Sequence, residues 1–302
     1  MSTQFSVWLA AARLRTLPLS VAGIITGNAI AVDQEVFSNG VFILSLLTAI
    51  AFQIISNFAN DYGDGIKGTD NADRLGPKRT LQQGLLTPKA LKNGIIICAF
   101  VAMSLAIALI YLSLGWEQLL VSLVFLILAV LAVWAAIKYT VGDNAYGYSG
   151  FGDLFVFLFF GWVSVMGAYY LQTQTVDLTA LFLGTAIGLM SVGVLNLNNM
   201  RDFTNDRNSH KNTLAVILGN YRAKRYHFFL IIFSGFFLFL GLGGSWMMNH
   251  PLSFLIFLPL LFHIYQVNRI KEERAFDPLL KQLALSTFFI SWIVFIIFSI
   301  YR

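Results

Sequence analysis

Nine long apolar runs constrain this chain more than any other feature of its sequence. A helix needs about 20 apolar residues to cross the hydrocarbon core of a bilayer. Runs of about that length lie at residues 15–32, 41–60, 92–113, 119–137, 153–171, 179–199, 227–246, 251–268 and 282–300. Only helices and closed barrels span lipid, because every backbone polar group must be satisfied there. The runs therefore predict an all-α polytopic membrane bundle of about nine transmembrane helices, with residues 1–302 forming a single domain.

The composition agrees with this class. Of the 302 residues, 57% are hydrophobic and 12% are charged, whereas about 25% of a soluble chain is charged. The single cysteine, Cys98, provides no disulfide framework or Cys-based metal site, and we expect it to be a small buried or lipid-facing residue. The net charge of +5 reflects topology, and no nucleic-acid partner is expected.

The basic residues predict the orientation of the bundle. Nineteen of the 20 Lys and Arg residues fall on one side of a nine-span topology, and Arg302 alone falls on the other. Cytoplasmic loops carry the excess of positive charge. We therefore expect a cytoplasmic N-terminus and an outside C-terminus, in the cytoplasmic (inner) membrane of a bacterium.

Two acidic motifs, at residues 57–88 and 196–213, follow the second and sixth runs. They share a spacing, seen as Asn60-x3-Asp64 and Asn198-x3-Asp202-x3-Asp206. A spacing of four places such groups on one helix face, and the repeat suggests an internal duplication. Ionised groups near hydrocarbon are costly unless a partner compensates them. Both motifs lie on the same predicted side, so we expect them to converge on a charged ligand.

The chemistry of the two motifs predicts what that ligand is. Oxygen ligands without nearby Cys or clustered His favour a hard cation such as Mg²⁺, which is commonly shared with substrate phosphates. Basic residues stand among the acids and suit the remaining phosphate oxygens. These are Lys67, Arg74, Arg79, Arg201 and Lys211. A metal-bound diphosphate accounts for both signs of charge; the alternative is that Asp and Asn cap helices in water.

Four stretches of the chain carry a resemblance to a known family. They are "AARLRTLPLS", "NFANDYGDGIKGTDNADRLGPKRTLQQGLLTP", "YGYSGFGDLFVFLFFG" and "NNMRDFTNDRNSHKNTLAVILG". Over nearly its whole length the chain resembles the UbiA superfamily of intramembrane aromatic prenyltransferases. The segments "RLGPKR…QQGLLTP" and "YGY…FVFLFFG" resemble its menaquinone-pathway branch, which acts on 1,4-dihydroxy-2-naphthoate.

The resemblance implies Mg²⁺-dependent transfer of a polyprenyl group from a polyprenyl diphosphate to 1,4-dihydroxy-2-naphthoate, with loss of CO₂. The site would open to the cytoplasmic side, its donor tail would lie in the lipid bilayer, and no obligate protein partner is implied. The implied catalytic acids are Asp64, Asp202 and Asp206. The implied metal ligands are Asn60, Asp64, Asp202 and Asp206, with Asp61 and Asn198 as second candidates. Lys138 and Tyr139 join the diphosphate-binding residues, and Arg13 and Arg15 are candidates for the acceptor's carboxylate.

The chain departs from the family pattern at three positions. Gly68 stands where another Asp is common, and Asp70 is its expected substitute. His210 replaces a usual glycine, and Asp153 replaces the usual acid of a "GLGE" segment.

The fifth run carries aromatic residues suited to an allylic cation, because aromatic faces attract cations. They are Phe155, Phe157, Phe159, Phe160 and Trp162. Most such residues face lipid or pack between helices, so we expect at most two to line the tunnel.

Other functions are open at this point. A cation-coupled transporter would place carboxylates near the midplane, and no Asp or Glu falls there. A membrane phosphotransferase for nucleotide-activated alcohols would need a DG-x2-AR…G-x3-D-x3-D segment, which is absent. Within the superfamily, prenylation of 4-hydroxybenzoate and the haem and chlorophyll types are the alternatives.

Overall fold

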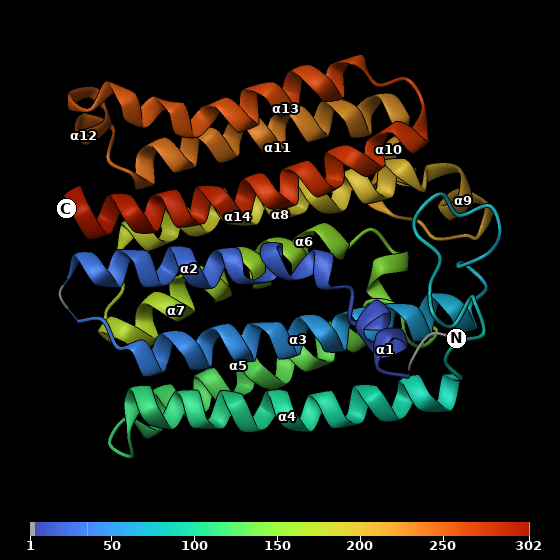
Figure 1. Cartoon of the computed structure of the whole chain (residues 1–302), viewed down its shortest axis with the longest axis horizontal. Coiled ribbons are helices and arrows are strands. Elements are labelled where there is room, and N and C mark those ends of the chain that lie inside the picture. Colours follow the sequence, from blue (N-terminus) through green and yellow to red (C-terminus); the bar gives the residue numbers. More distant parts are fainter. Residues whose placement is uncertain (1–3, 35, 302) are drawn as a thin grey trace.

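The nine predicted spans are helical in the computed structural model, which describes residues 4–34 and 36–301 (Figure 1). These residues contain no strand. The elements are α1 (Gln4–Ala12), η1 (Leu14–Thr16), α2 (Leu17–Asp33), α3 (Asn39–Ile66), α4 (Pro88–Leu114), α5 (Leu119–Lys138), η2 (Tyr146–Tyr148), α6 (Gly152–Val156), η3 (Phe157–Val163), α7 (Ser164–Thr173), α8 (Leu178–Arg201), α9 (Phe203–Asn208), α10 (Leu214–Leu218), α11 (Asn220–Gly241), α12 (Gly244–Asn249), η4 (Pro251–Phe257), α13 (Leu258–Arg269), η5 (Glu273–Ala275) and α14 (Phe276–Tyr301). The predicted all-α membrane bundle is confirmed.

Several helices extend beyond the predicted apolar runs, as α14 does by beginning at Phe276 instead of residue 282, and two further cases show why. Helix α3 continues to Ile66 instead of ending at residue 60, so Asn60 and Asp64 lie on its last turns. Helix α11 begins at Asn220 instead of residue 227, directly after Gly219 at φ 78°. In both places the helix includes polar residues that lie outside the apolar run. Hydrogen-bonded or snorkelling polar side chains do not by themselves end a helix.

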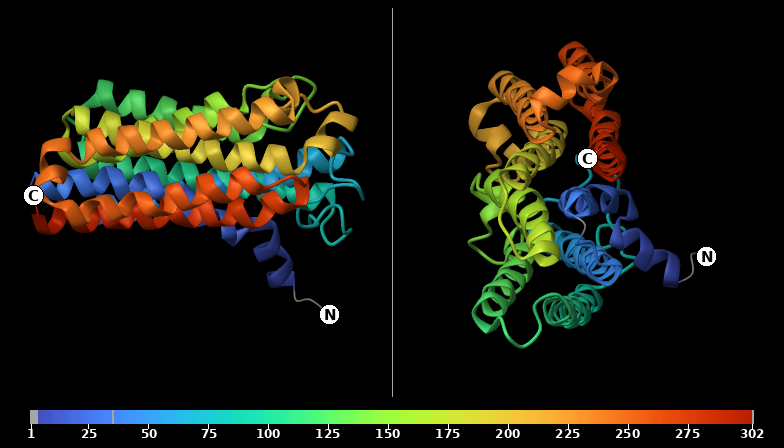
Figure 2. Two further views of the ribbon diagram at one scale, coloured as in Figure 1. Left: turned by 90° about the horizontal axis from the view of Figure 1, so that it is seen from above. Right: turned by 90° about the vertical axis from the view of Figure 1, so that its left-hand side faces the viewer.

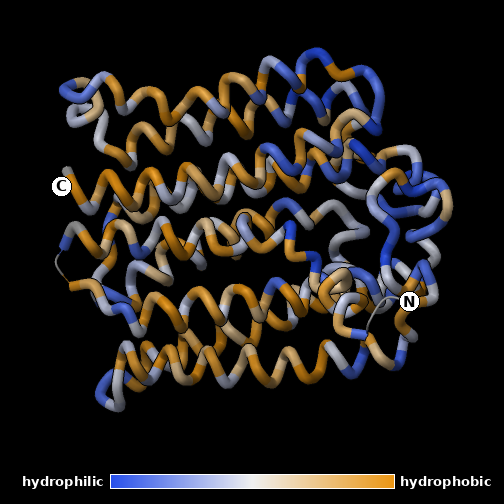
Figure 3. Tube along the Cα trace, in the orientation of Figure 1, coloured by the Kyte–Doolittle hydropathy of each residue, from blue (hydrophilic) through white to orange (hydrophobic). Residues whose placement is uncertain are grey.

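Polar residues gather at one end of the bundle. Figure 3 shows the hydrophilic segments beside α9, α10 and the loop between α3 and α4. Helix α14 runs to the opposite end, and α1 turns away from the bundle near the polar end (Figures 1 and 2). The described basic residues follow the predicted one-sided pattern, whereas Arg302 lies outside the described residues. The orientation of this end relative to the cell stays a prediction.

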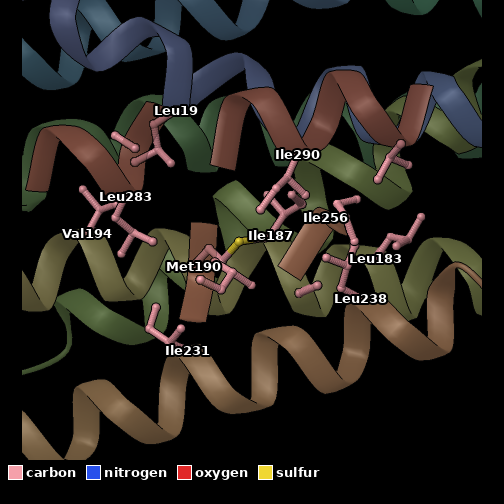
Figure 4. Packing of buried hydrophobic residues seen from close by; sticks show 14 of the residues in the cluster. Leu19, Leu183, Ile187, Met190, Val194, Ile231, Leu238, Ile256, Leu283 and Ile290 are labelled. Atoms are coloured by element: carbon pink, nitrogen blue, oxygen red, sulfur yellow. The ribbon is translucent and has the colours of Figure 1, made fainter. Parts of the chain in front are cut away.

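Helix α8 lies in the middle of the largest hydrophobic core. Its residues Leu183, Ile187 and Met190 are each at most 1% exposed. They pack against apolar side chains of α2, α11 and α14, which include Leu19, Ile231, Leu238, Leu283 and Ile290 (Figure 4). The spacing of three and four residues places this α8 face on one side of the helix. Because α8 is packed in this way, the acidic motif at its end has a fixed position.

Glycines allow helices to approach closely around η3. A Cβ added at Gly161 in η3 would lie 2.6 Å from the carbonyl oxygen of Gly184 in α8. Similarly, a Cβ at Gly27 in α2 would lie 2.2 Å from the carbonyl oxygen of Val165 in α7. Small residues are the usual means of close helix packing in membranes. Phe157 and Trp162 of η3 also lie against this glycine-containing face of α8.

Candidate active site

The two acidic motifs meet at the polar end, as the sequence predicts. Lys211 of the second motif places its Nζ 3.2 Å from Oδ2 of Asp64 in the first. Arg74 lies between the motifs: its Nε is 3.1 Å from Asp70 Oδ1, and its Nη2 is 3.7 Å from Asp202 Oδ2. Each motif thus supplies cations to the other's carboxylates.

Asp64 is the most heavily contacted of the predicted catalytic acids. It is 2% exposed and lies on the last turns of α3. Beyond Lys211, its carboxylate accepts a 2.8 Å hydrogen bond from the Tyr148 hydroxyl and lies 3.3 Å from Nη2 of Arg79. Residues from three separate segments therefore fix its position.

Tyr148 is a site residue that the sequence analysis missed. Its hydroxyl also lies 2.6 Å from Thr69 Oγ1, and Lys67 Nζ lies 3.9 Å above its ring centroid. Burial, and then the charge of Asp64, raise the pKa of Tyr148, so the hydroxyl keeps its proton. The only sequence signal for this residue is its place in the "YGY" segment of η2.

Asp61 is directed away from the cavity. Its Oδ2 accepts hydrogen bonds from the backbone N–H and the hydroxyl of Thr80, and its Oδ1 accepts one from the N–H of Leu81. These bonds anchor the loop that carries Arg74 and Arg79. The geometry gives Asp61 this anchoring role, and the direct metal contact proposed for it stays a prediction.

Asp70, the expected substitute for a carboxylate at position 68, orders two arginines. Arg74 and Arg79 place their Nε atoms 3.1 and 3.2 Å from its oxygens. Burial raises the pKa of Asp70 despite these partners. Burial opposes the charge of Arg79, but Asp64 and Asp70 raise its pKa above the ordinary value. Both arginines line the cavity, and Asp70 does not.

Arg201 is saturated by protein groups. It is 1% exposed, and it donates to Asp202 at 3.1 and 2.6 Å, to Asp277 at 2.6 Å and to Asn198 at 2.8 Å. Burial raises the pKa of Asp202, but the bonds and charge of Arg201 outweigh that and lower it overall. Arg201 thus joins α8 to the start of α14, and Asp277 is a further partner that the sequence analysis missed.

Asp206 is the least compensated carboxylate of the second motif. It is 4% exposed and forms no ion pair within residues 4–34 and 36–301. Burial raises its pKa to about 7, against the attraction of Lys211. A positive charge bound nearby would lower the pKa of this buried carboxyl and favour its ionised form.

The donor set fits Mg²⁺ shared with a substrate. The described residues contain no group of three His, Cys, Asp or Glu side chains arranged as a complete metal cage. Asn60, Asp64 and Asn198 nevertheless line the cavity with oxygen donors, and Asp206 has no ion-pair partner in the part of the chain that the structure describes. Mg²⁺ characteristically takes only one or two protein carboxylates and completes its shell with water and phosphate oxygens.

A cavity of about 470 Å³ extends from this polar end into the bundle. It follows α3 from Asp64 to Ser45, a distance of about 28 Å at about 1.5 Å per helical residue. Of the described residues that line it, only Arg15, Pro278 and Lys281 are exposed. Its mouth therefore lies between η1 and the start of α14, with a cation on each side.

Three aromatic residues of the fifth span line the cavity, so the expectation of at most two was wrong. They are Phe155, Phe159 and Phe160. Phe155 belongs to α6, whereas Phe159 and Phe160 belong to η3, whose π-helical geometry adds a residue to the turn. Tyr146 stacks on Phe155 at 4.1 Å, and Phe155 on Phe159 at 6.4 Å between ring centroids. Phe157 packs against Gly188 of α8 on the other side.

The remaining predicted residues divide into two groups. Those that line the cavity are Arg13, Arg15, Arg74, Arg79, Tyr139 and Lys211. Those that do not are Lys67, Lys138, Arg201, Asp202 and Asp206.

Burial raises the pKa of Tyr139, so its hydroxyl remains protonated beside the charged cluster. His210 has φ 55°, the left-handed region that glycine prefers, which accounts for the glycine usual at this position.

Comparisons with known proteins agree with this geometry. Residues 20–298 match the model of the UbiA prenyltransferase family. A 1,4-dihydroxy-2-naphthoate octaprenyltransferase of Haemophilus influenzae is 38% identical, over 99% of this chain and 96% of its own length. The enzyme of the same name from Escherichia coli is 46% identical, over 75% of this chain and 73% of its own.

Solved structures share the fold at lower identity. A UbiA homolog from Aeropyrum pernix has a TM-score of 0.65 at 14% identity, covering 98% of this chain and 99% of that one. A UbiA homolog from Archaeoglobus fulgidus, bound to DMAPP and Mg²⁺, has a TM-score of 0.62 at 13% identity, covering 94% and 99%. The match across residues 20–298, together with two acidic motifs that close one end of an apolar cavity, establishes that this chain belongs to the UbiA prenyltransferase family.

Proposed function

We propose that this prenyltransferase transfers a polyprenyl group from its diphosphate to 1,4-dihydroxy-2-naphthoate, releasing CO₂ and diphosphate and giving demethylmenaquinol for menaquinone biosynthesis. The observation that carries the proposal is a single cavity, charged at one end and lined by apolar and aromatic side chains along the rest. A polyprenyl diphosphate has the same division. The names of the similar enzymes from E. coli and H. influenzae supply the acceptor and favour an octaprenyl donor.

The charged end suits the diphosphate. Arg74, Arg79 and Lys211 line the cavity there and bring positive charge toward phosphate oxygens. Asn60, Asp64 and Asn198 are the oxygen donors on the cavity wall that would hold Mg²⁺, whereas Asp202 and Asp206 are buried and do not line the cavity. When bound, Mg²⁺ would neutralise and orient the leaving diphosphate. Asp61, Asp70 and Tyr148 act on the substrate indirectly, because they fix the residues that face it.

The aromatic stack suits the reacting carbon. As the C–O bond of the donor breaks, its electron pair leaves with the diphosphate and an allylic cation remains. Tyr146, Phe155 and Phe159 present ring faces along the cavity, and such faces attract a cation. The electron-rich carbon that carries the acceptor's carboxylate attacks, and the C–CO₂ bond then breaks to restore the aromatic ring.

The acceptor's carboxylate fits the cationic mouth. Arg13 and Arg15 line the cavity, and neither forms an ion pair with any described residue. Lys281 stands exposed at the same mouth. A carboxylate entering here would meet unpaired guanidinium groups, which bind carboxylates in bidentate fashion.

The decisive experiment uses purified protein, carboxyl-labelled naphthoate, octaprenyl diphosphate and Mg²⁺. We expect ¹⁴CO₂ release that requires both the diphosphate and the metal and stops in excess EDTA. The Asp64→Asn variant is the matched negative control. Efficient prenylation of 4-hydroxybenzoate without turnover of the naphthoate would overturn the acceptor assignment, and full activity in EDTA would overturn the metal assignment.

The proposed orientation has the charged mouth at the cytoplasmic face of a bacterial inner membrane. It is supported by the position of 19 of 20 basic residues and the positive-inside rule. A reporter fused to the N-terminus should be active in the cytoplasm, and one fused to the C-terminus should be active outside it. Reporters on the same side would contradict the proposed topology.

A further inference from the structure

The turn between α1 and α2 contains a strained residue. Arg13 has φ 50° and ψ 61°, a left-handed conformation that residues with a Cβ rarely adopt. Gln174 and His210 are the other described non-glycine residues with positive φ. A strained backbone persists only where its surroundings hold it, and it is enriched at functional sites.

A buried asparagine holds this turn. Asn57 of α3 is 2% exposed, and its Nδ2 donates to the carbonyl oxygen of Ala12 at 2.8 Å and to Thr16 Oγ1 at 3.0 Å. Thr16 Oγ1 in turn donates to the carbonyl oxygen of Arg13 at 2.9 Å. Gln53, one turn before Asn57, completes the network by donating to Asn57 Oδ1 at 3.1 Å. The residues on both sides of Arg13 are thus tied to one side chain of α3.

The turn presents cations to the cavity. Arg13, Arg15 and Thr16 all line it, as does Asn57. The Nη2 of Arg13 is buried and has no hydrogen-bond partner. A buried, unpartnered guanidinium nitrogen is costly, and an acceptor oxygen of a molecule bound in the cavity would satisfy it.

We propose that Asn57 is a positioning residue for the acceptor: through Thr16 and the Ala12 carbonyl it holds Arg13 in the left-handed conformation that directs its guanidinium at the acceptor's carboxylate. This inference rests on the proposed function, since it takes Arg13 and Arg15 to be the carboxylate's partners. It assigns Asn57 a role distinct from that of Asn60 one turn later, which faces the diphosphate end. Asn57 has no part in bond breaking.

The inference predicts a selective defect. In the Asn57→Ser and Thr16→Val variants, the KM for the naphthoate should rise about tenfold, as expected when a hydrogen bond to a charged group is misaligned. The KM for octaprenyl diphosphate should stay within about twofold of the parent value. The carboxylate-free acceptor 1,4-dihydroxynaphthalene, which loses a ring proton instead of CO₂, should be turned over equally by parent and variants. A general loss of structure would lower all of these rates together.

A double-mutant cycle with Arg13→Ala completes the test. Residues that act through one another give non-additive effects, so Asn57→Ser should change the naphthoate KM by less than about twofold in the Arg13→Ala background. Independent, multiplicative effects would overturn the inference. So would an unchanged naphthoate KM in both Asn57→Ser and Thr16→Val while Arg13→Ala raises it. If Arg13→Ala and Arg15→Ala leave that KM unchanged, the carboxylate site of the proposed function is wrong, and the positioning role fails with it.

Discussion

The two acidic motifs share an Asn-x3-Asp spacing, yet they hold their carboxylates in different ways. In the first motif, α3 continues unbroken through Asp64, and Asp61 is bound by the motif's own loop. In the second, α8 ends at Arg201, Asp202 separates it from α9, and Asp206 forms no ion pair among the described residues. Equal spacing therefore does not make equal sites, because the compensation of each charge depends on residues distant in sequence.

The comparison also separates groups that face the substrate from groups that hold them. Asp64 lines the cavity, whereas Asp61, one turn earlier, anchors the loop that brings Arg74 and Arg79 to the same place. Ion pairs buried near hydrocarbon stabilise only when both partners are present. Substitutions in the two motifs should thus differ in kind as well as in size.

The largest effect is expected where the motifs share their charge. Asp64→Asn and Asp202→Asn should each lower turnover by more than about a hundredfold, the scale of losing one electrostatic contact in a reaction's transition state. Steady-state CO₂ release measures this, with size-exclusion profiles in detergent to show that both variants remain folded. Near-normal turnover in either variant would mean that one motif suffices and that the charge shared between the motifs is not needed for catalysis.

A smaller loss is expected from Tyr148, whose hydroxyl contacts Asp64 of the first motif and whose ring centroid lies 5.1 Å from Nζ of Lys211 in the second. Tyr148→Phe removes the hydroxyl that contacts Asp64 and Thr69, and we expect kcat/KM to fall about tenfold, equivalent to about 1.4 kcal/mol. Tyr146→Phe, which removes a hydroxyl bonded to the Ala135 carbonyl, is the matched control and should fall less. Equal losses in the two variants would show that Tyr148 has no special connection to Asp64.

Asp61→Asn should act mainly on stability. It weakens the anchoring of Thr80 and Leu81, which should lower the free energy of unfolding by about 1–3 kcal/mol. Turnover measured well below the unfolding temperature should fall less than about tenfold, because Asp61, unlike Asp64 and Asp202, forms no ion pair with a cavity-lining cation among the described residues. Thermal unfolding in detergent and turnover are measured on the same preparation. A loss of turnover as large as that of Asp64→Asn, without a shift in unfolding, would instead place Asp61 on the metal.

The smallest effect concerns the backbone of the second motif. His210→Gly should relieve the left-handed strain at φ 55°, worth about 1 kcal/mol. We expect a slightly higher unfolding temperature and turnover within about twofold of the parent. His210→Ala, which keeps the Cβ, should show no such stabilisation. A large loss of turnover in both variants would reveal a direct role for the imidazole.

Much of the fold was predictable because lipid permits few solutions. Hydropathy alone located all nine spans, and residue spacing indicated that the motifs at the ends of α3 and α8 converge. The prediction failed at α11, where basic residues on the first turns concealed the helix start. It also failed for the aromatics of the fifth span, three of which line the cavity; part of this span, η3, is π-helical, a geometry that a periodicity of 3.6 does not reveal.

The sequence by itself determined the class of protein, the candidate cations and carboxylates, and their common end of the bundle. Only the tertiary structure decided their partners: Arg201 is saturated by Asp202, Asp277 and Asn198, Asp61 holds a loop, and Tyr148 and Asn57 position charged residues from other segments. The physical reason is the range of the interactions. Hydropathy and spacing report on neighbours within a helix, whereas the compensation of a buried charge depends on which side chains packing brings within hydrogen-bonding distance.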